Sequence, residues 1–157
     1  MLPLILFSSC LNPFAPKLET DETGGFELGN LHTIDGLFQN LQYAYTFRDT
    51  TIYGPLIDRD FLFTYRDYEI GVDKSWGRAE EMKATYGLFT NAQRLDLIWN
   101  EILSLSPDST VVIRSFELTV TFNPVDIEDA RGKVNLQLKK NQEGNWKIIK
   151  WIDQSDY

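Results

Sequence analysis

The sequence predicts an α+β fold in which a curved antiparallel sheet wraps around N-terminal helices. Two patterns support this class. Apolar residues recur at helical spacing in segments between residues 34 and 89, whereas most of residues 95–151 alternates as strands do. Helices in one half of a chain and a strand meander in the other favour helices packed on one face of a single sheet. A length of 157 residues fits one domain.

The first helix is predicted to begin after Thr33, whose hydroxyl can cap it. Its apolar stripe consists of Ile34, Leu37, Phe38, Leu41 and Tyr45. A short second helix is expected over residues 51–57, limited by Gly54-Pro55. Residues 60–66 are aromatic and predict the first strand, and residues 67–77 predict a loop with at most a short strand.

A third helix is predicted over residues 78–89. Glu80 and Glu81 in its first turn suit the helix dipole, and we interpret this acid pair as a solvated face. The apolar positions expected to share the buried face are Ala79, Met82, Tyr86 and Phe89.

Strands account for the rest of the chain. Leu95, Leu97 and Trp99 alternate with polar residues, which predicts one half-buried strand. Residues 110–122 form a long run whose apolar phase shifts between Ile113 and Phe116, which indicates a bulge there. Residues 134–138 predict another strand, and residues 142–145 predict a hairpin turn before the last one.

Composition limits the function classes. The chain carries 15 basic and 23 acidic residues, a formal net charge of -8. Because such a surface repels phosphate, no nucleic-acid binding is expected. A single cysteine cannot form an internal disulfide, and a single histidine rules out a multi-histidine metal site. No apolar run reaches the roughly 20 residues of a membrane-spanning helix. We expect no metal and no cofactor.

The first residues suggest where in the cell the protein is located. The apolar run Leu2 to Phe7, followed by Ser8-Ser9-Cys10, resembles the lipobox of bacterial lipoprotein signal peptides. That resemblance implies cleavage before Cys10, lipid on its thiol, and membrane anchoring by two or three acyl chains. Residues 1–9 would then be a signal peptide, which lacks a basic start and is short. Residues 10–30 would be a tether, and Asn12 after the cysteine favours the outer membrane of a Gram-negative cell. The alternatives are a frayed apolar terminus with a buried cysteine and a soluble domain.

The element order and the closing residues resemble the nuclear transport factor 2-like superfamily, also called the cystatin-like cone. Residues 136–153 carry most of the resemblance, with a polar hairpin, then Gly144-Asn145-Trp146-Lys147-Ile148, then a terminal aromatic and acid. Residues 41–63 resemble the opening elements of the family. The match covers residues 31–157. It implies a sheet wrapped around the first helix and an apolar pocket at the wide end, which members use for catalysis, ligand binding or protein binding.

We expect aromatic residues to form that pocket. The candidates are Tyr45, Tyr53, Phe61, Phe63, Trp76, Trp99 and Phe116. An isomerase or dehydratase would also need a carboxylate near Tyr45 or Tyr53, because an acid in an apolar wall can move protons near neutral pH. The candidate acids are Asp60, Asp96, Glu101 and Glu117, each of which has a simpler solvated or turn role. His32 precedes the first helix and is expected in a loop, which argues against a dehydratase of the His-Asp type.

The last strand carries apolar side chains in both phases. Ile149 and Trp151 alternate with Trp146 and Ile148, so they are expected on the outer face, where they could form a homodimer interface. The leading interpretation is therefore a lipid-anchored, non-catalytic cell-envelope domain that binds a small apolar ligand or a protein partner. The alternative is a small cone-fold isomerase or dehydratase.

Overall fold

The computed structural model describes residues 27–156, with side chains through residue 154. Its elements are α1 (Ile34–Phe47), α2 (Thr50–Tyr53), a 3-10 turn (Gly54–Leu56), β1 (Ile57–Asp67), β2 (Val72–Gly77), α3 (Arg78–Asn91), β3 (Arg94–Leu105), β4 (Val111–Asn123), β5 (Asp126–Lys140) and β6 (Trp146–Asp156). The predicted α+β class is confirmed, and the predicted loop before α3 contains the strand β2.

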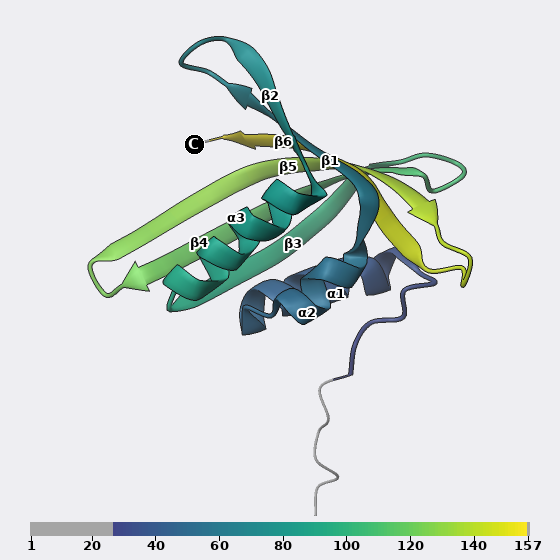
Figure 1. The fold of residues 1–157 in the computed structure, drawn as a ribbon, viewed down its shortest axis with the longest axis horizontal. Coiled ribbons are helices and arrows are strands. Elements are labelled where there is room, and N and C mark those ends of the chain that lie inside the picture. Colours follow the sequence, from purple (N-terminus) through teal and green to yellow (C-terminus); the bar gives the residue numbers. More distant parts are fainter. Residues whose placement is uncertain (1–26, 157) are drawn as a thin grey trace, which may run out of the picture.

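One six-stranded sheet has the order β2-β1-β6-β5-β4-β3 (Figure 1). Four of its neighbouring pairs are antiparallel, but β1 runs parallel to β6. The sheet is therefore mixed, where the sequence predicted an antiparallel one. Local alternation cannot reveal this pairing, because β1 reaches β6 across the whole intervening chain.

Helix α1 begins as predicted, since Thr33 Oγ1 accepts a hydrogen bond from the N–H of Gly36 at 3.0 Å. Leu37, Phe38 and Leu41 from its stripe are buried in a core shared with α3 and the inner face of the sheet. That core is the interior that the wrapped sheet was expected to provide. Figure 1 shows the long strands β3, β4 and β5 curving past the helices.

Helix α3 buries a different face from the one predicted. Its buried residues are Glu81, Thr85 and Phe89, whereas Ala79 is exposed and Tyr86 is 62% exposed. The prediction placed the apolar residues inward by default. It was wrong for Ala79, Tyr86 and Glu81 because a buried hydrogen-bond network, described below, holds the carboxylate inside.

The predicted bulge lies on the neighbouring strand. Register is continuous between β4 and β5 from Val111 to Thr121, so β4 alternates without interruption. The irregularities fall on β3, between Trp99 and Ser104, opposite Phe116 to Ile113. Arg114 supplies the explanation, because it occupies an inner-face position of β4 and interrupts the apolar pattern without any shift of the backbone.

A second irregularity determines on which face of the sheet the side chains at the end of β6 lie. Gln137 pairs with Lys150 and Leu138 with Ile148, so Ile149 is an extra residue in β6. Trp146, Ile148 and Trp151 consequently all lie in the core, and Trp151 is only 9% exposed. The expectation that Trp151 lies on the outer face is wrong, and Ile149 is half-buried at the bulge. Homodimerisation through this strand stays a prediction, without Trp151 to support it.

The segment before α1 joins the fold at Gly29. Its N–H donates to Asn40 Oδ1 at 2.6 Å, and its carbonyl accepts from Asn40 Nδ2 at 3.0 Å. Cys10 and the signal peptide expected over residues 1–9 lie outside the described residues. Within the described part of the chain, no helix has the length and apolar character needed to cross a bilayer.

Two helical glycines give opposite predictions for stability. A Cβ on Gly36 would lie 2.0 Å from the carbonyl oxygen of Asn30, whereas a Cβ on Gly87 would meet nothing within 4 Å. We expect Gly36→Ala to lower the free energy of unfolding by about 1–3 kcal/mol through overpacking. Gly87→Ala should raise it by about 0.4–1 kcal/mol through helix propensity and reduced chain entropy. Urea unfolding of both variants tests this, and equal effects of the same sign would contradict it.

Candidate functional site

A cavity of about 140 Å³ opens on the inner face of the sheet. It lies between the end of α1 and strands β1, β3, β4, β5 and β6. Its lining residues are Tyr45, Phe63, Leu97, Phe116, Leu118, Ala130, Trp151 and Asp153. Four are aromatic and one is an acid. A cavity of this size matches one benzene-sized guest, since an apolar protein cavity of roughly 150 Å³ is known to hold benzene.

The structure divides the predicted pocket residues into two groups. Tyr45, Phe63 and Phe116 line the cavity. The other candidates, Tyr53, Phe61, Trp76 and Trp99, are not among its lining residues. Phe61 and Tyr53 belong to the core, and the indole N–H of Trp99 donates to the carbonyl of Phe38 at 3.1 Å. Trp151, predicted at an interface, lines the cavity instead.

Behind the cavity wall lies a buried carboxylate. Glu81, only 6% exposed, accepts three hydrogen bonds. The Tyr53 hydroxyl donates to its Oε1 at 2.6 Å, the Trp76 indole donates to its Oε2 at 2.6 Å, and the Thr85 hydroxyl donates to Oε1 at 3.1 Å. Both carboxylate oxygens therefore act as acceptors, which is the hydrogen-bonding pattern of an ionised acid.

Burial controls the protonation state of the Tyr53 phenol. Loss of solvent raises its pKa well above the ordinary value of 10.0, and the neighbouring Tyr45 and Glu81 raise it further. The phenol therefore keeps its proton at neutral pH and stays a donor to Glu81. This fixed donor role, away from the cavity lining, gives Tyr53 a structural task and removes it from the candidate catalytic groups.

Two ring contacts connect the Glu81 network to the cavity. Trp76 stacks on Phe63, with ring centroids 4.5 Å apart and planes inclined by 13°. Tyr53 meets Tyr45 edge to face, with centroids 6.1 Å apart. Each of these two donors to Glu81 thus packs against a ring that lines the cavity, so the carboxylate lies one aromatic layer behind it.

The acids proposed from the sequence do not reach this interior. Asp60 and Glu101 are exposed, and Glu117 is exposed on the outer face. Asp96 is salt-bridged to Arg94, with N–O contact at 2.7 Å. His32 is exposed in the turn before α1, as expected.

Sequence reasoning missed Glu81 and Asp153. Glu81 is in phase with Thr85 and Phe89 at spacings of four and eight residues, a signal that was present but overruled by its charge. Asp153 follows Trp151 by two residues and shares its face. No site prediction was made for Asp153, because regular alternation through Ile149 hides the phase that places it beside Trp151.

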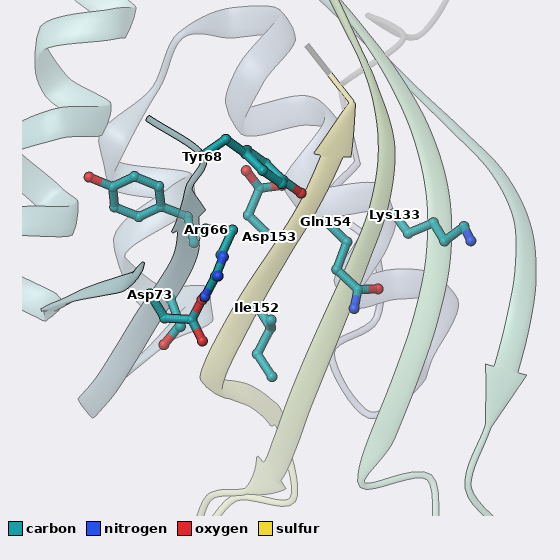
Figure 2. Close-up of a pocket in the computed structure, with 9 residues that line it drawn as sticks. Arg66, Tyr68, Asp73, Lys133, Ile152, Asp153 and Gln154 are labelled. Atoms are coloured by element: carbon teal, nitrogen blue, oxygen red, sulfur yellow. The ribbon is translucent and has the colours of Figure 1, made fainter. Parts of the chain in front are cut away.

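A larger, polar cleft lies where the sheet splits (Figure 2). The last pair between β1 and β6 joins Thr64 to Ile152, after which the β1–β2 hairpin diverges from β6 (Figure 1). The cleft measures about 470 Å³ and is lined by Thr64, Tyr65, Arg66, Tyr68, Asp73, Lys133, Ile152, Asp153 and Gln154. Asp153 lines both this cleft and the inner cavity.

The described residues include no group of three His, Cys, Asp or Glu side chains arranged to hold a metal ion. The ion pair in the outer cleft joins Arg66 to Asp73 at 2.9 Å, and both side chains are about half exposed or more. Such exposed pairs contribute little to stability. The chemistry available to the inner site is therefore that of aromatic rings, one hydroxyl and one carboxylate.

Comparison with known structures defines the fold. A protein from Novosphingobium aromaticivorans DSM 12444, provisionally assigned as a scytalone dehydratase, matches with TM-score 0.65 and 15% identity over 79% of this chain and 82% of that one. A conserved protein from Planctomyces limnophilus DSM 3776 matches with TM-score 0.61 and 14% identity, over 78% of this chain and 93% of that one. Nuclear transport factor 2 from Cryptosporidium parvum matches with TM-score 0.59 and 13% identity, over 78% of this chain and 90% of that one.

The chain therefore has the nuclear transport factor 2-like fold that the closing residues suggested. A scan against protein-family models gives no match. A search of curated protein sequences gives none either. At identities near 15% these structural matches establish the shared architecture, and function has to be argued from the site.

The Glu81 network gives a prediction with a built-in control. In Glu81→Gln the new amide would point N–H groups at the Tyr53 hydroxyl or the Trp76 indole, both of which are donors. We expect the free energy of unfolding to fall by about 1–3 kcal/mol, the usual cost of a broken buried hydrogen bond. The adjacent Glu80→Gln, on the exposed side of α3, should change it by less than about 0.5 kcal/mol. Equal effects in urea unfolding would show that the network does not stabilise the fold.

Proposed function

We propose that this domain binds a small, largely apolar molecule in the inner cavity and does not transform it. The observation that carries the proposal is the lining itself, with Tyr45, Phe63, Phe116 and Trp151 around a space of about 140 Å³. Ligand sites are typically concave and mostly apolar, with a few polar groups that orient the guest. Tyr45 and Asp153 are the residues of this lining that carry such polar groups.

The size of the cavity limits the guest. Typical sites for drug-sized ligands measure about 300–1,000 Å³. At about 140 Å³ this one accepts a single ring or a short branched chain, and any longer substituent has to extend into the solvent or the outer cleft. The rigid wall of packed rings, including the Phe63–Trp151 pair at 6.2 Å, supports a preformed site.

Filling the cavity tests the proposal. Ala130 lines the space, so Ala130→Leu adds bulk where the ligand would lie. We expect benzene, used as an apolar probe, to bind the unchanged protein and to lose at least tenfold in affinity in this variant. Ligand-detected NMR or calorimetry measures the affinity.

The matched control is Ala84→Leu, the same change at an exposed position of α3 away from the cavity. It should leave benzene affinity unchanged. Equal affinity in Ala130→Leu, with both variants folded by circular dichroism, would move the binding site elsewhere and contradict the proposal.

We also propose that the domain is held at the bacterial cell envelope by lipid on Cys10. The support is the run Leu2 to Phe7 followed by Ser8-Ser9-Cys10, together with the acidic, glycine-containing stretch before Gly29, whose length suits a tether. Two or three acyl chains would give stable anchoring, where one gives only marginal binding.

Expression of the full chain in a bacterial host tests the anchor. We expect the protein to fractionate with membranes and its N-terminal peptide to begin at an acylated Cys10 by mass spectrometry. Cys10→Ala should then remain unprocessed and unacylated. A free Cys10 thiol in the soluble fraction would refute the anchor and leave the cavity proposal untouched.

A second candidate function is proton transfer by an isomerase or dehydratase. The observation in its favour is that Tyr45, which carries a hydroxyl, and Asp153, which carries a carboxylate, line the same mostly apolar cavity. Recovery of a bound ligand unchanged after prolonged incubation would favour simple binding, and its conversion would favour catalysis.

A further inference from the structure

Strands β5 and β6 concentrate positive charge on an otherwise acidic chain. The formal net charge of the whole chain is -8. Residues 131–152 nevertheless contain one acid, Glu143, and the basic residues Arg131, Lys133, Lys139, Lys140, Lys147 and Lys150. The two strands and their turn therefore form a positive region on a negative molecule, and such a region attracts a negatively charged partner.

Three of these lysines share the outer face of the sheet. Lys139 lies opposite Lys147 in the register, and Lys150 lies opposite Gln137 on one side and Leu62 on the other. Each lysine is adjacent in its strand to a core residue, so its own side chain points to the opposite face. The helices pack on the inner face, where the core lies (Figure 1). We call Lys139, Lys147 and Lys150 the lysine patch.

Two of the three lysines in the patch are not in ion pairs. Lys139 Nζ lies 2.8 Å from Asp58 Oδ1, which neutralises its charge. Lys147 donates a hydrogen bond to the carbonyl of Pro55, which is a neutral acceptor. Within residues 27–154, the ion pairs within 4 Å do not include Lys147 or Lys150. The patch therefore presents two positive charges beside one neutral pair.

The end of the β5–β6 hairpin adds one charge of each sign. Lys140 is exposed, and its Nζ lies 4.9 Å from the centroid of the Trp146 ring. Glu143 is exposed in the turn, where it accepts a hydrogen bond from Asn145 Nδ2 at 3.1 Å. Because these two charges offset each other, the positive charge of this surface comes from the lysine patch.

The N-terminal segment enters the fold beside the patch. The N–H of Trp146, which directly precedes Lys147, donates to the carbonyl of Leu31 at 2.8 Å. Residues 10–30 make up the tether proposed above. A random-coil segment of about 20 residues has an r.m.s. length of about 25 Å. Lipid on Cys10 would therefore keep the lysine patch within reach of the bilayer.

From these observations we propose that the lysine patch docks on a bilayer surface of anionic phospholipid. The inference rests on the proposed lipid anchor, because it names the face that the anchored domain turns to the membrane. Lysines near such a surface are attracted by its negative potential, and their long stems let the ammonium groups reach the headgroups. Leu62, which is 39% exposed beside Lys150, adds an apolar contact.

Two further features favour this occupant. A second copy of the chain fits this face less well, because a two-fold symmetric contact would set one positive patch against the other. The inner cavity lies on the opposite face of the sheet. Docking through the lysine patch would therefore leave the cavity open to a ligand.

Vesicle binding of the full chain with Cys10→Ala tests the surface without the lipid. By co-sedimentation at low salt, we expect at least tenfold tighter binding to phosphatidylglycerol vesicles than to phosphatidylcholine vesicles. Lys147→Gln combined with Lys150→Gln should weaken binding to phosphatidylglycerol at least fivefold, since one lysine near an anionic surface contributes about fivefold. Arginine at both positions should preserve binding.

The matched control is Lys74→Gln combined with Lys83→Gln, which removes the same charge at exposed positions of β2 and α3. It should weaken binding less than twofold. If it weakens binding as much as the patch substitutions do, overall charge determines binding and the inference is overturned. Equal binding to both kinds of vesicle overturns it as well.

Sedimentation velocity tests the competing occupant. A dimer that the patch substitutions dissociate would make the outer face an interface between copies and would overturn the inference. The anchor is tested separately, by mass spectrometry of Cys10. Failure of the anchor and failure of the docking surface are therefore distinguishable.

Discussion

Helix α1 fills the inside of the curved sheet, and this packing is the constraint on which the other features depend. Leu37, Phe38 and Leu41 are fully buried, and each such side chain contributes about 1.5–3 kcal/mol. Gly36 lets the incoming chain pass directly over the first turn of the helix. Because α1 occupies only part of the concave side, the sheet encloses a remaining space at the end of the helix. The cavity is that remainder, so its small volume follows from the packing of one helix.

The sequence predicted the elements well because each depends on local spacing. The capped first helix, the alternation of β3 and the hairpin turn before β6 all arise from contacts close in the chain. The parallel partnership of β1 and β6 could not be predicted, since it joins residues about 90 positions apart. The bulge at Ile149 was equally hidden, because Ile148 and Ile149 are chemically identical and either can face inward.

The site was predicted in part. Tyr45, Phe63 and Phe116 were expected in the pocket, since aromatic residues of three separate elements had to meet inside a wrapped sheet. Of the charged members, Glu81 was assigned to solvent because isolated acids avoid the interior, and Asp153 was not predicted as a site residue. Their burial depends on specific donors and on a shift of strand phase. Both are tertiary effects that a single sequence does not display.

The extra residue in β6 has a consequence for comparing this chain with others of its fold. The same strand without the bulge, with Ile149 taking part in regular alternation, would turn Ile152 and Gln154 inward and send Trp151 and Asp153 to the opposite side. One local bulge thus separates a cavity that contains an acid from one closed by aliphatic and amide groups. Relatives aligned by their terminal Trp-Lys-Ile segment can differ completely in what they recognise, although their backbones superimpose.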